Sequence, residues 1–271
     1  MSADVGDRAV IELERVSVVR EGKRILDDVT WRVERGECWA IMGANGAGKS
    51  TLLSVLSGYT WPTSGVIRVL GGTYGRVDLG EVRERTGLME PSRMPEFDGR
   101  MSCREVIATG LYGTVMLPFW REIGEAEWER VEREVMAIGL GAIAGEGFGK
   151  LSTGEKAKVL IGRAVVGEPE LFILDEPTAG LDMRNRAEIV AMLDGIMTRE
   201  RRPTMIVVSH HFDELPGTLD KVLLLKRGGV LRQGRAEEVV TSENISEAFG
   251  CSAEVFRRNG RFAASVRVSS G

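Results

Sequence analysis

The chain has 271 residues, a formal net charge of −4 and 43% hydrophobic residues, enough for one large core with an inserted subdomain. No apolar run approaches the roughly 18 residues of a membrane-spanning helix, and the basic residues are dispersed among acids, so we expect no nucleic-acid partner. Three unpatterned cysteines favour reduced thiols over disulfides or a metal site. Residues 1–4 lack the charged-then-apolar start of a secretory signal, so we expect a cytoplasmic protein.

Two segments alternate apolar and polar positions, residues 10–35 and residues 66–75. Alternation with a period of two is typical of strands that bury one face, and together these segments predict an antiparallel β layer. The run Cys38–Met42 is wholly apolar instead, which suits a strand buried on both faces of a parallel sheet.

A glycine-rich loop follows this buried strand and precedes an expected helix over residues 48–56. The order strand, glycine loop, helix is the context of a P-loop, in which backbone N–H groups and the positive end of the helix hold a polyphosphate. Lys49 would reach the β- and γ-phosphates, and the Ser50 hydroxyl would ligate Mg²⁺. The loop supplies the expected nucleotide-binding residues Gly43, Asn45, Gly46, Ala47, Gly48, Lys49, Ser50 and Thr51.

A mostly helical region is expected from about residue 90 to 165. Its last helix begins at Leu151-Ser152-Thr153-Gly154-Glu155, a pentapeptide that plain P-loop enzymes lack. Within this region, residues 111–120 are apolar but broken by Gly and Pro. This stretch is either a groove for a partner, for which exposed Tyr, Phe, Met and Trp are suited, or part of the subdomain core.

Two acids, Asp175 and Glu176, follow the four apolar residues Leu171–Leu174 and stand at the exposed end of this next buried strand, at the same sheet edge as the P-loop. Asp175 is the candidate Mg²⁺ partner through water, and Glu176 is the candidate base that polarises the attacking water. A further apolar strand, Met205–Val208, is followed by Ser209 and His210.

Taken together, these motifs resemble those of the ATP-binding cassette family over roughly residues 10 to 250. The resemblance implies that Ser152 and Gly154 contact the γ-phosphate bound by the opposite subunit. It also implies that Asp182, within Ala179-Gly180-Leu181-Asp182, lies at the dimer seam, and that His210 touches the γ-phosphate. A register slip of one residue would exchange His210 with His211.

The family resemblance also defines the expected architecture. It is an α/β P-loop NTPase with a RecA-like parallel sheet core, an antiparallel β subdomain and an inserted helical subdomain. We expect one cassette over residues 8–250 and a C-terminal β-hairpin extension over 251–271, because Asn259-Gly260 is a strong two-residue turn signal.

Two positions depart from the family pattern. Arg20 stands where an aromatic residue stacks on adenine, and its guanidinium plane could stack on the base instead. Glu90 stands where a glutamine is expected after the strand over residues 86–89. Either Glu90 faces the metal in its place, or the coupling of nucleotide to partner is altered. A similar pattern occurs in cassettes resembling molybdate or iron-complex importers.

The resulting hypothesis is that the chain is the ATPase subunit of a bacterial transporter, and we favour an importer over an exporter. It would act as a homodimer with ATP and Mg²⁺ on a separate transmembrane permease, peripheral on the inner face of the membrane. Glu176, His210 and Lys49 would be its catalytic residues.

Two alternatives belong to other classes. The first is a soluble cassette ATPase serving repair, assembly or translation, although translation factors of the family carry two cassettes and its repair ATPases usually contain a long coiled coil. The second is a small-molecule kinase or GTPase, which the signature disfavours; the chain also lacks an Asn-Lys-x-Asp motif. Nothing in the sequence identifies a transported substrate.

Overall fold

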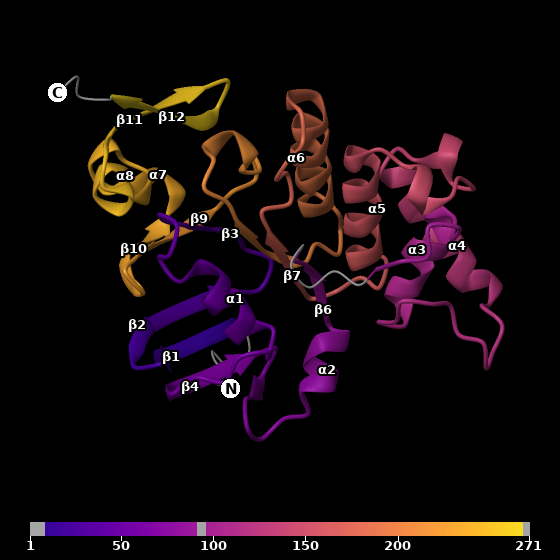
Figure 1. Cartoon of the computed structure of the whole chain (residues 1–271), viewed down its shortest axis with the longest axis horizontal. Helices are drawn as coiled ribbons and strands as arrows, with labels where there is room; N and C mark the ends of the chain where they lie inside the picture. The colour runs from indigo at the N-terminus through magenta and orange to yellow at the C-terminus, as the bar shows by residue number, and fades with distance from the viewer. Residues whose placement is uncertain (1–8, 91–95, 268–271) are drawn as a thin grey trace, which may run out of the picture.

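A computed structural model describes residues 9–90 and 96–267. An antiparallel sheet, a central sheet, a helical region and a small C-terminal unit lie around one centre (Figure 1). Among the described residues, no helix combines the length and the apolar character needed to cross a bilayer.

The central sheet has six strands in the order β10-β9-β3-β8-β7-β6. Five of them pair in parallel, and β10 closes one edge antiparallel to β9. The register pairs both Ile41 and Asp175 with Val208, so the carboxyl ends of β3, β7 and β8 meet at one edge. The strands are β3 (Cys38–Met42), β6 (Thr86–Met89), β7 (Leu171–Asp175), β8 (Thr204–Val208), β9 (Lys221–Lys226) and β10 (Gly229–Arg235).

A four-stranded antiparallel sheet in the order β2-β1-β4-β5 covers one face of the core. The helix α1 (Lys49–Leu56) packs between the two sheets, because one apolar cluster contains Leu52 of α1, Trp31 of the antiparallel layer and Ile41 of β3. The strands of this layer are β1 (Ala9–Arg20), β2 (Lys23–Glu34), β4 (Ser64–Val69) and β5 (Gly72–Thr73).

The opposite face of the central sheet is covered by α5 (Thr153–Val165) and α6 (Met183–Met197), whose apolar residues share a cluster with β7 and β8. Between β6 and α5 lies the helical insert, which has its own core and extends away from the sheets (Figure 1). Beside it, α2 (Leu79–Glu84) precedes β6, and the insert itself contains α3 (Cys103–Ala108) and α4 (Glu125–Ala137). The parallel core, the antiparallel layer and the helical insert confirm the predicted fold class.

The C-terminal unit packs on the β9 side of the central sheet. It contains α7 (Ala236–Val239), α8 (Ser242–Phe249) and a hairpin of β11 (Ser252–Arg258) and β12 (Arg261–Arg267). The turn between these strands uses Asn259 and Gly260, both with positive φ. An ion pair of 2.8 Å between Arg261 and Asp194 ties the hairpin to α6.

Candidate active site

The phosphate loop connects β3 to α1 and has a backbone that requires glycine at its last turn. Gly48 has φ 103°, and a Cβ there would stand 2.8 Å from Leu26 Cδ2 and 2.9 Å from the carbonyl oxygen of Ile25. Asn45 and Gly46 at the tip are exposed, as expected of a loop that presents its N–H groups to a ligand.

The side chain of Lys49 folds back over this loop and is only 7% exposed. Its Nζ donates hydrogen bonds to the carbonyl oxygens of Gly43 at 2.7 Å and Ala44 at 3.1 Å. Burial lowers the Lys49 pKa, while the charges of Glu176 and Asp175 oppose that shift. The ammonium group therefore lies within electrostatic reach of both carboxylates, in a place where a polyphosphate would compensate its charge.

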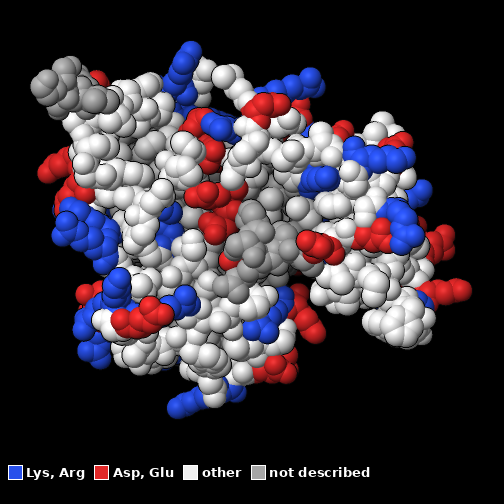
Figure 2. All heavy atoms as spheres, in the orientation of Figure 1, with Lys and Arg blue, Asp and Glu red and all other residues white. Residues whose placement is uncertain are grey.

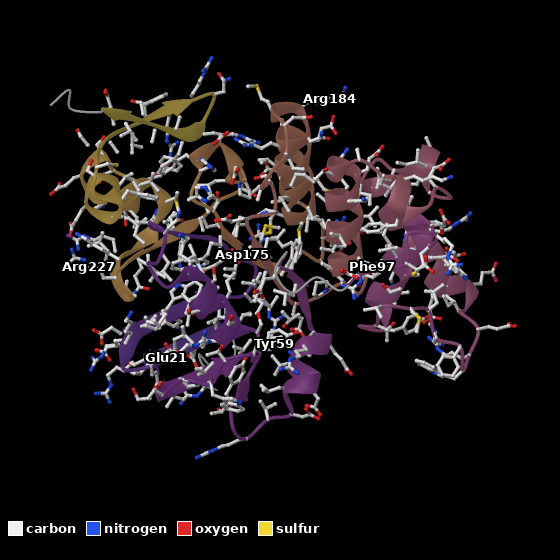
Figure 3. All side chains as sticks on the ribbon, viewed as in Figure 1. Glu21, Tyr59, Phe97, Asp175, Arg184 and Arg227 are labelled. Carbon is white, nitrogen blue, oxygen red and sulfur yellow. The ribbon has the colours of Figure 1, made fainter. Side chains whose placement is uncertain are left out.

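The strand β7 brings Asp175 to the centre of the molecule, where the layers meet (Figure 3). Burial raises the pKa of Asp175 to about 6, and the negative charges of Glu176 and Glu90 add to the effect. Glu90, at the end of β6, is 3% exposed. Acidic side chains also gather near the middle of the face shown in Figure 2.

The three carboxylates suit a divalent cation that is shared with a nucleotide. Burial is the largest cause of the raised pKa of Asp175, and repulsion from Glu176 and Glu90 adds to it; a cation would offset both effects. Carboxylate and hydroxyl oxygens are the ligands that Mg²⁺ prefers. Within the described parts of the chain, no group of three or more acids, His or Cys is arranged to hold a metal alone. Mg²⁺ characteristically keeps several waters and binds through one or two carboxylates plus phosphates, so the residues present fit this mode.

Glu176 directly follows β7 and turns away from it. Its φ is 48°, an uncommon conformation for a residue with a side chain, and its N–H donates to the carbonyl oxygen of Val208 at 2.9 Å. The strained conformation at a carboxylate beside a phosphate loop is typical of a functional residue.

His210 contacts Glu176 directly, with 2.9 Å between Nδ1 and Oε1. The preceding residue fixes the loop, because the buried Ser209 hydroxyl donates to Glu214 at 2.5 Å and accepts from the N–H of His211 at 2.9 Å. His211 is exposed and only stacks near His210, with ring centroids 4.0 Å apart. The histidine beside the candidate base is therefore His210.

A second group of predicted residues lies at the beginnings of α5 and α6. Ser152 caps α5 in a reciprocal capping box with Glu155, whose carboxylate accepts from the Ser152 hydroxyl at 2.6 Å and its N–H at 2.8 Å. Asp182 caps α6 by accepting from the N–H of Asn185 at 2.8 Å. Ser152 and Asp182 are both exposed.

Asn185 lies between the two caps, and our sequence analysis did not predict this role. Its side-chain amide donates to Asp182 at 2.9 Å, while a Cβ at Gly154 would stand 2.2 Å from its Oδ1. Only glycine therefore fits against Asn185 at this point of α5. The spacing of three residues between Asp182 and Asn185 could have predicted that these two residues form a helix cap. It could not have predicted the contact of Asn185 with α5, which depends on tertiary packing.

Arg20 lies at the exposed end of β1. Its guanidinium donates to the Thr60 hydroxyl at 2.9 Å, which holds it beside the loop after α1. The described structure thus assembles the phosphate loop, Asp175, Glu176 and His210 at one edge of the central sheet. No hydrogen bond or ion pair between described residues joins this group to Ser152, Gly154 or Asp182.

The sequence also matches a known protein family. The family model described as ABC transporter matches residues 26–179 of this chain. The chain belongs to the ABC transporter family. It is similar to the uncharacterized ABC transporter ATP-binding protein YlmA of Bacillus subtilis, with 38% identity over 89% of this chain and 90% of that protein.

Other relatives carry more specific names. The cobalt import ATP-binding protein CbiO of Rhodobacter capsulatus is 35% identical over 81% of this chain and 76% of its own length. Among solved structures, cbiO1 of Clostridium perfringens, part of the ABC transporter complex cbiONQ, superimposes with a TM-score of 0.75 at 27% identity, covering 89% of this chain and 94% of that one.

Membership in the family gives the chain its activity. It is an ATP-binding subunit of an ABC transporter and an ATPase that hydrolyses ATP. The predicted transport ATPase is therefore confirmed, in preference to a soluble cassette ATPase for repair, assembly or translation and to a small-molecule kinase or GTPase.

Proposed function

We propose that two copies of this chain close around two ATP molecules, so that each site combines the phosphate loop of one copy with Ser152 and Gly154 of the other. The division of the predicted site into two groups supports this proposal, because among the described residues no hydrogen bond or ion pair links a signature residue to the phosphate loop of the same copy. Met183, beside Asp182, supports it further, since 86% of this apolar side chain is exposed.

Within each site, Lys49 and the loop N–H groups would hold the β- and γ-phosphates. Ser50 and Asp175 would hold Mg²⁺, which supplies charge neutralisation on the phosphates when bound, and Glu90 would face the same space. Glu176 would take a proton from the attacking water, and His210 would orient the Glu176 carboxylate through their contact of 2.9 Å. Arg20 would stack on the base. The observation that carries this catalytic assignment is the pairing of Glu176 with His210 beside Asp175.

The mechanism predicts that blocked hydrolysis traps the dimer. Glu176→Gln should bind ATP and elute as a dimer in size-exclusion chromatography with Mg-ATP, whereas wild type should return to the monomer as it turns over. Ser152→Ala combined with Glu176→Gln is the matched control, because this double variant lacks the Ser152 hydroxyl that would contact the nucleotide of the other copy. A Glu176→Gln protein that stays monomeric at saturating Mg-ATP would contradict the sandwich.

A separate permease would dock on the helical insert. A cavity of about 840 Å³ lies between the central sheet and the insert, lined by residues that include Tyr59, Arg83 and Tyr112. In the 111–120 segment, which contributes Tyr112 to this cavity, Phe119 is 90% exposed and Trp120 is 65% exposed. This exposure argues against a core role for the tip of the 111–120 segment and supports a membrane-protein partner, with the chain on the cytoplasmic face.

Docking is tested by ATP-dependent rebinding to membranes stripped of the native cassette. Tyr112→Ser with Phe119→Ser should retain the melting temperature and basal ATPase rate but lose saturable binding. Met136→Ser is the matched control, because Met136 is an exposed apolar residue of α4, 68% exposed. Undiminished binding by the double variant would remove this surface from the interface.

We further propose that the complex is an importer of a metal ion or metal complex, like molybdate- or iron-complex-type systems. Support comes from the relative named for cobalt import and from the hemin import ATP-binding protein HmuV of Bordetella avium, which is 29% identical over 90% of this chain. Comparing the cellular content of transition metals and molybdenum between wild-type cells and cells producing only Glu176→Gln tests it. Equal contents under limitation for each metal would contradict import of metals.

A further inference from the structure

A second cavity, of about 440 Å³, lies where the C-terminal hairpin meets the central sheet, on the β9 side of the molecule. Its volume falls within the range of small-molecule sites. Apolar walls come from the short helix over residues 212–214, from the loop that follows it and from the hairpin: Phe212, Leu215, Leu219 and Phe262. The cavity is separate from the phosphate loop, because it shares none of the loop residues 43–51.

Six cationic side chains line this cavity against three acidic ones. Four of the cations already have carboxylate partners, in the pairs Arg35 with Glu170, Lys221 with Glu37, Arg257 with Glu237 and Arg261 with Asp194. The remaining acid, Asp220, accepts the backbone N–H of Cys38 at 2.8 Å.

Arg202 and Arg235 are the two cations left over. In the described part of the chain, no hydrogen bond or ion pair joins either of them to another side chain. The guanidinium of Arg202 packs close to the backbone of Gly36, because a Cβ added to Gly36 would lie 3.3 Å from Arg202 Nε. The cavity therefore combines two available guanidinium groups with aromatic and aliphatic walls, which suits a small organic molecule bearing at least two anionic groups.

The wall of the cavity continues into the catalytic loop. Phe212 and Leu215 line the cavity, and Glu214 between them holds the Ser209 hydroxyl at 2.5 Å. Ser209 directly precedes His210, which contacts Glu176. Asp194 reinforces the same region, because it binds both Arg261 of the hairpin and the N–H and hydroxyl of Thr218.

We propose that this cavity binds a small dianionic or trianionic metabolite, carboxylate or phosphate ester, and that its occupancy changes the rate of ATP hydrolysis. Arg202 and Arg235 would bind the anionic groups, and Phe212 and Phe262 would contact the carbon skeleton. A ligand touching Phe212 and Leu215 would alter the position of His210 through the segment that begins at Ser209.

The test is calorimetric titration of the full chain, without Mg²⁺, with citrate, glycerol 3-phosphate and acetate. We expect citrate or glycerol 3-phosphate to bind with Kd below about 1 mM and acetate at least about tenfold more weakly. If citrate binds more tightly than glycerol 3-phosphate, the ligand is a polycarboxylate; if glycerol 3-phosphate binds more tightly, the ligand is a phosphate ester. Equal, millimolar binding of all three would overturn the proposal.

Variants locate the binding. Arg202→Gln with Arg235→Gln should weaken the stronger ligand at least about tenfold, whereas Arg76→Gln with Arg133→Gln, which removes the same charge from exposed positions, should not. Lys49→Ala must retain binding, because it disables only the phosphate loop. Loss in Lys49→Ala, or equal loss in both arginine pairs, would show that the anion binds elsewhere.

Regulation has its own readout. At fixed free Mg²⁺, a saturating concentration of the ligand should change kcat of wild type at least about twofold and leave kcat of the Arg202→Gln, Arg235→Gln variant unchanged. Both variants should melt within about 2 °C of wild type without ligand, since the substituted side chains are exposed. Binding without any change in kcat would overturn the regulatory half of the proposal. This result is distinguishable from failure of the proposed transport function, because neither measurement requires a permease.

Discussion

Nδ1 of His210 lies 2.9 Å from Oε1 of Glu176, although the two residues follow different strands of the central sheet. A carboxylate that takes a proton from water must keep one orientation while the water approaches, and a hydrogen bond to the imidazole provides it. The neighbouring His211 makes no such contact with Glu176 among the described residues. His211 therefore serves as the control for a substitution of His210 in the first prediction.

His210→Gln should lower kcat about 10²-fold, because loss of orientation at a reacting group carries a cost of this size. His211→Gln should stay within about twofold of wild type. Steady-state ATPase assays at saturating Mg-ATP measure both. If the His211 variant is the more damaged one, the register assigned to this loop is wrong.

Glu176→Gln should lower kcat by about 10²- to 10⁴-fold while retaining ATP binding, because only the proton acceptor is removed. Single-turnover hydrolysis and nucleotide titration separate the two effects. Glu129→Gln on the surface of α4 is the matched control and should behave as wild type. Near-normal turnover by Glu176→Gln would exclude it as the base.

Gly154→Ala should destabilise the protein by about 1–3 kcal/mol, because its Cβ would stand 2.2 Å from Asn185 Oδ1. Adding Asn185→Ala should recover part of this loss, since the obstructing amide is gone. Urea denaturation of the two single variants and the double variant gives the coupling, which we expect to exceed about 0.5 kcal/mol. Simple additivity would mean that the two residues do not press against each other.

Asp175 predicts a pH dependence of stability. Its pKa in the folded protein is about 6, above the ordinary 3.8, so the folded state holds the proton more tightly than the unfolded state. Stability from this group is therefore fully present below pH 3.8 and is lost as the pH rises through 6. Asp175→Asn should consequently gain on the order of 1 kcal/mol at pH 8, after allowance for solvent screening, and a smaller amount at pH 5. Melting curves at both pH values measure this; an equal gain at both would contradict the raised pKa.

Arg20 should confer weak base selectivity. A guanidinium that stacks without reading base edges should bind ATP and GTP within about tenfold, or 1.4 kcal/mol, and Arg20→Ala should weaken both equally. Arg20→Tyr is the informative companion, since an aromatic ring should restore the stacking lost in Arg20→Ala. Strong preference for ATP that survives Arg20→Ala would assign selectivity to another residue.

The sequence by itself determined the features that depend on local pattern. The apolar run Cys38–Met42 predicted a buried strand at the bounds that the structure has, because strands covered on both faces need continuous apolar residues. The run Leu171–Leu174 predicted a second buried strand, which in the structure also includes Asp175. Glycine spacing predicted the turn from β3 into α1 for a similar reason, since few other residues fit that backbone.

Tertiary structure decided what those elements bring together. The order of strands in the sheet places Glu176 beside His210 and Glu90 near Asp175, and sheet order depends on packing between residues far apart in the chain. The contact of Asn185 with Gly154 and the cationic cavity under the hairpin arise in the same way. Side chains from separate elements meet there only after the apolar faces have packed, so no local pattern could have predicted them.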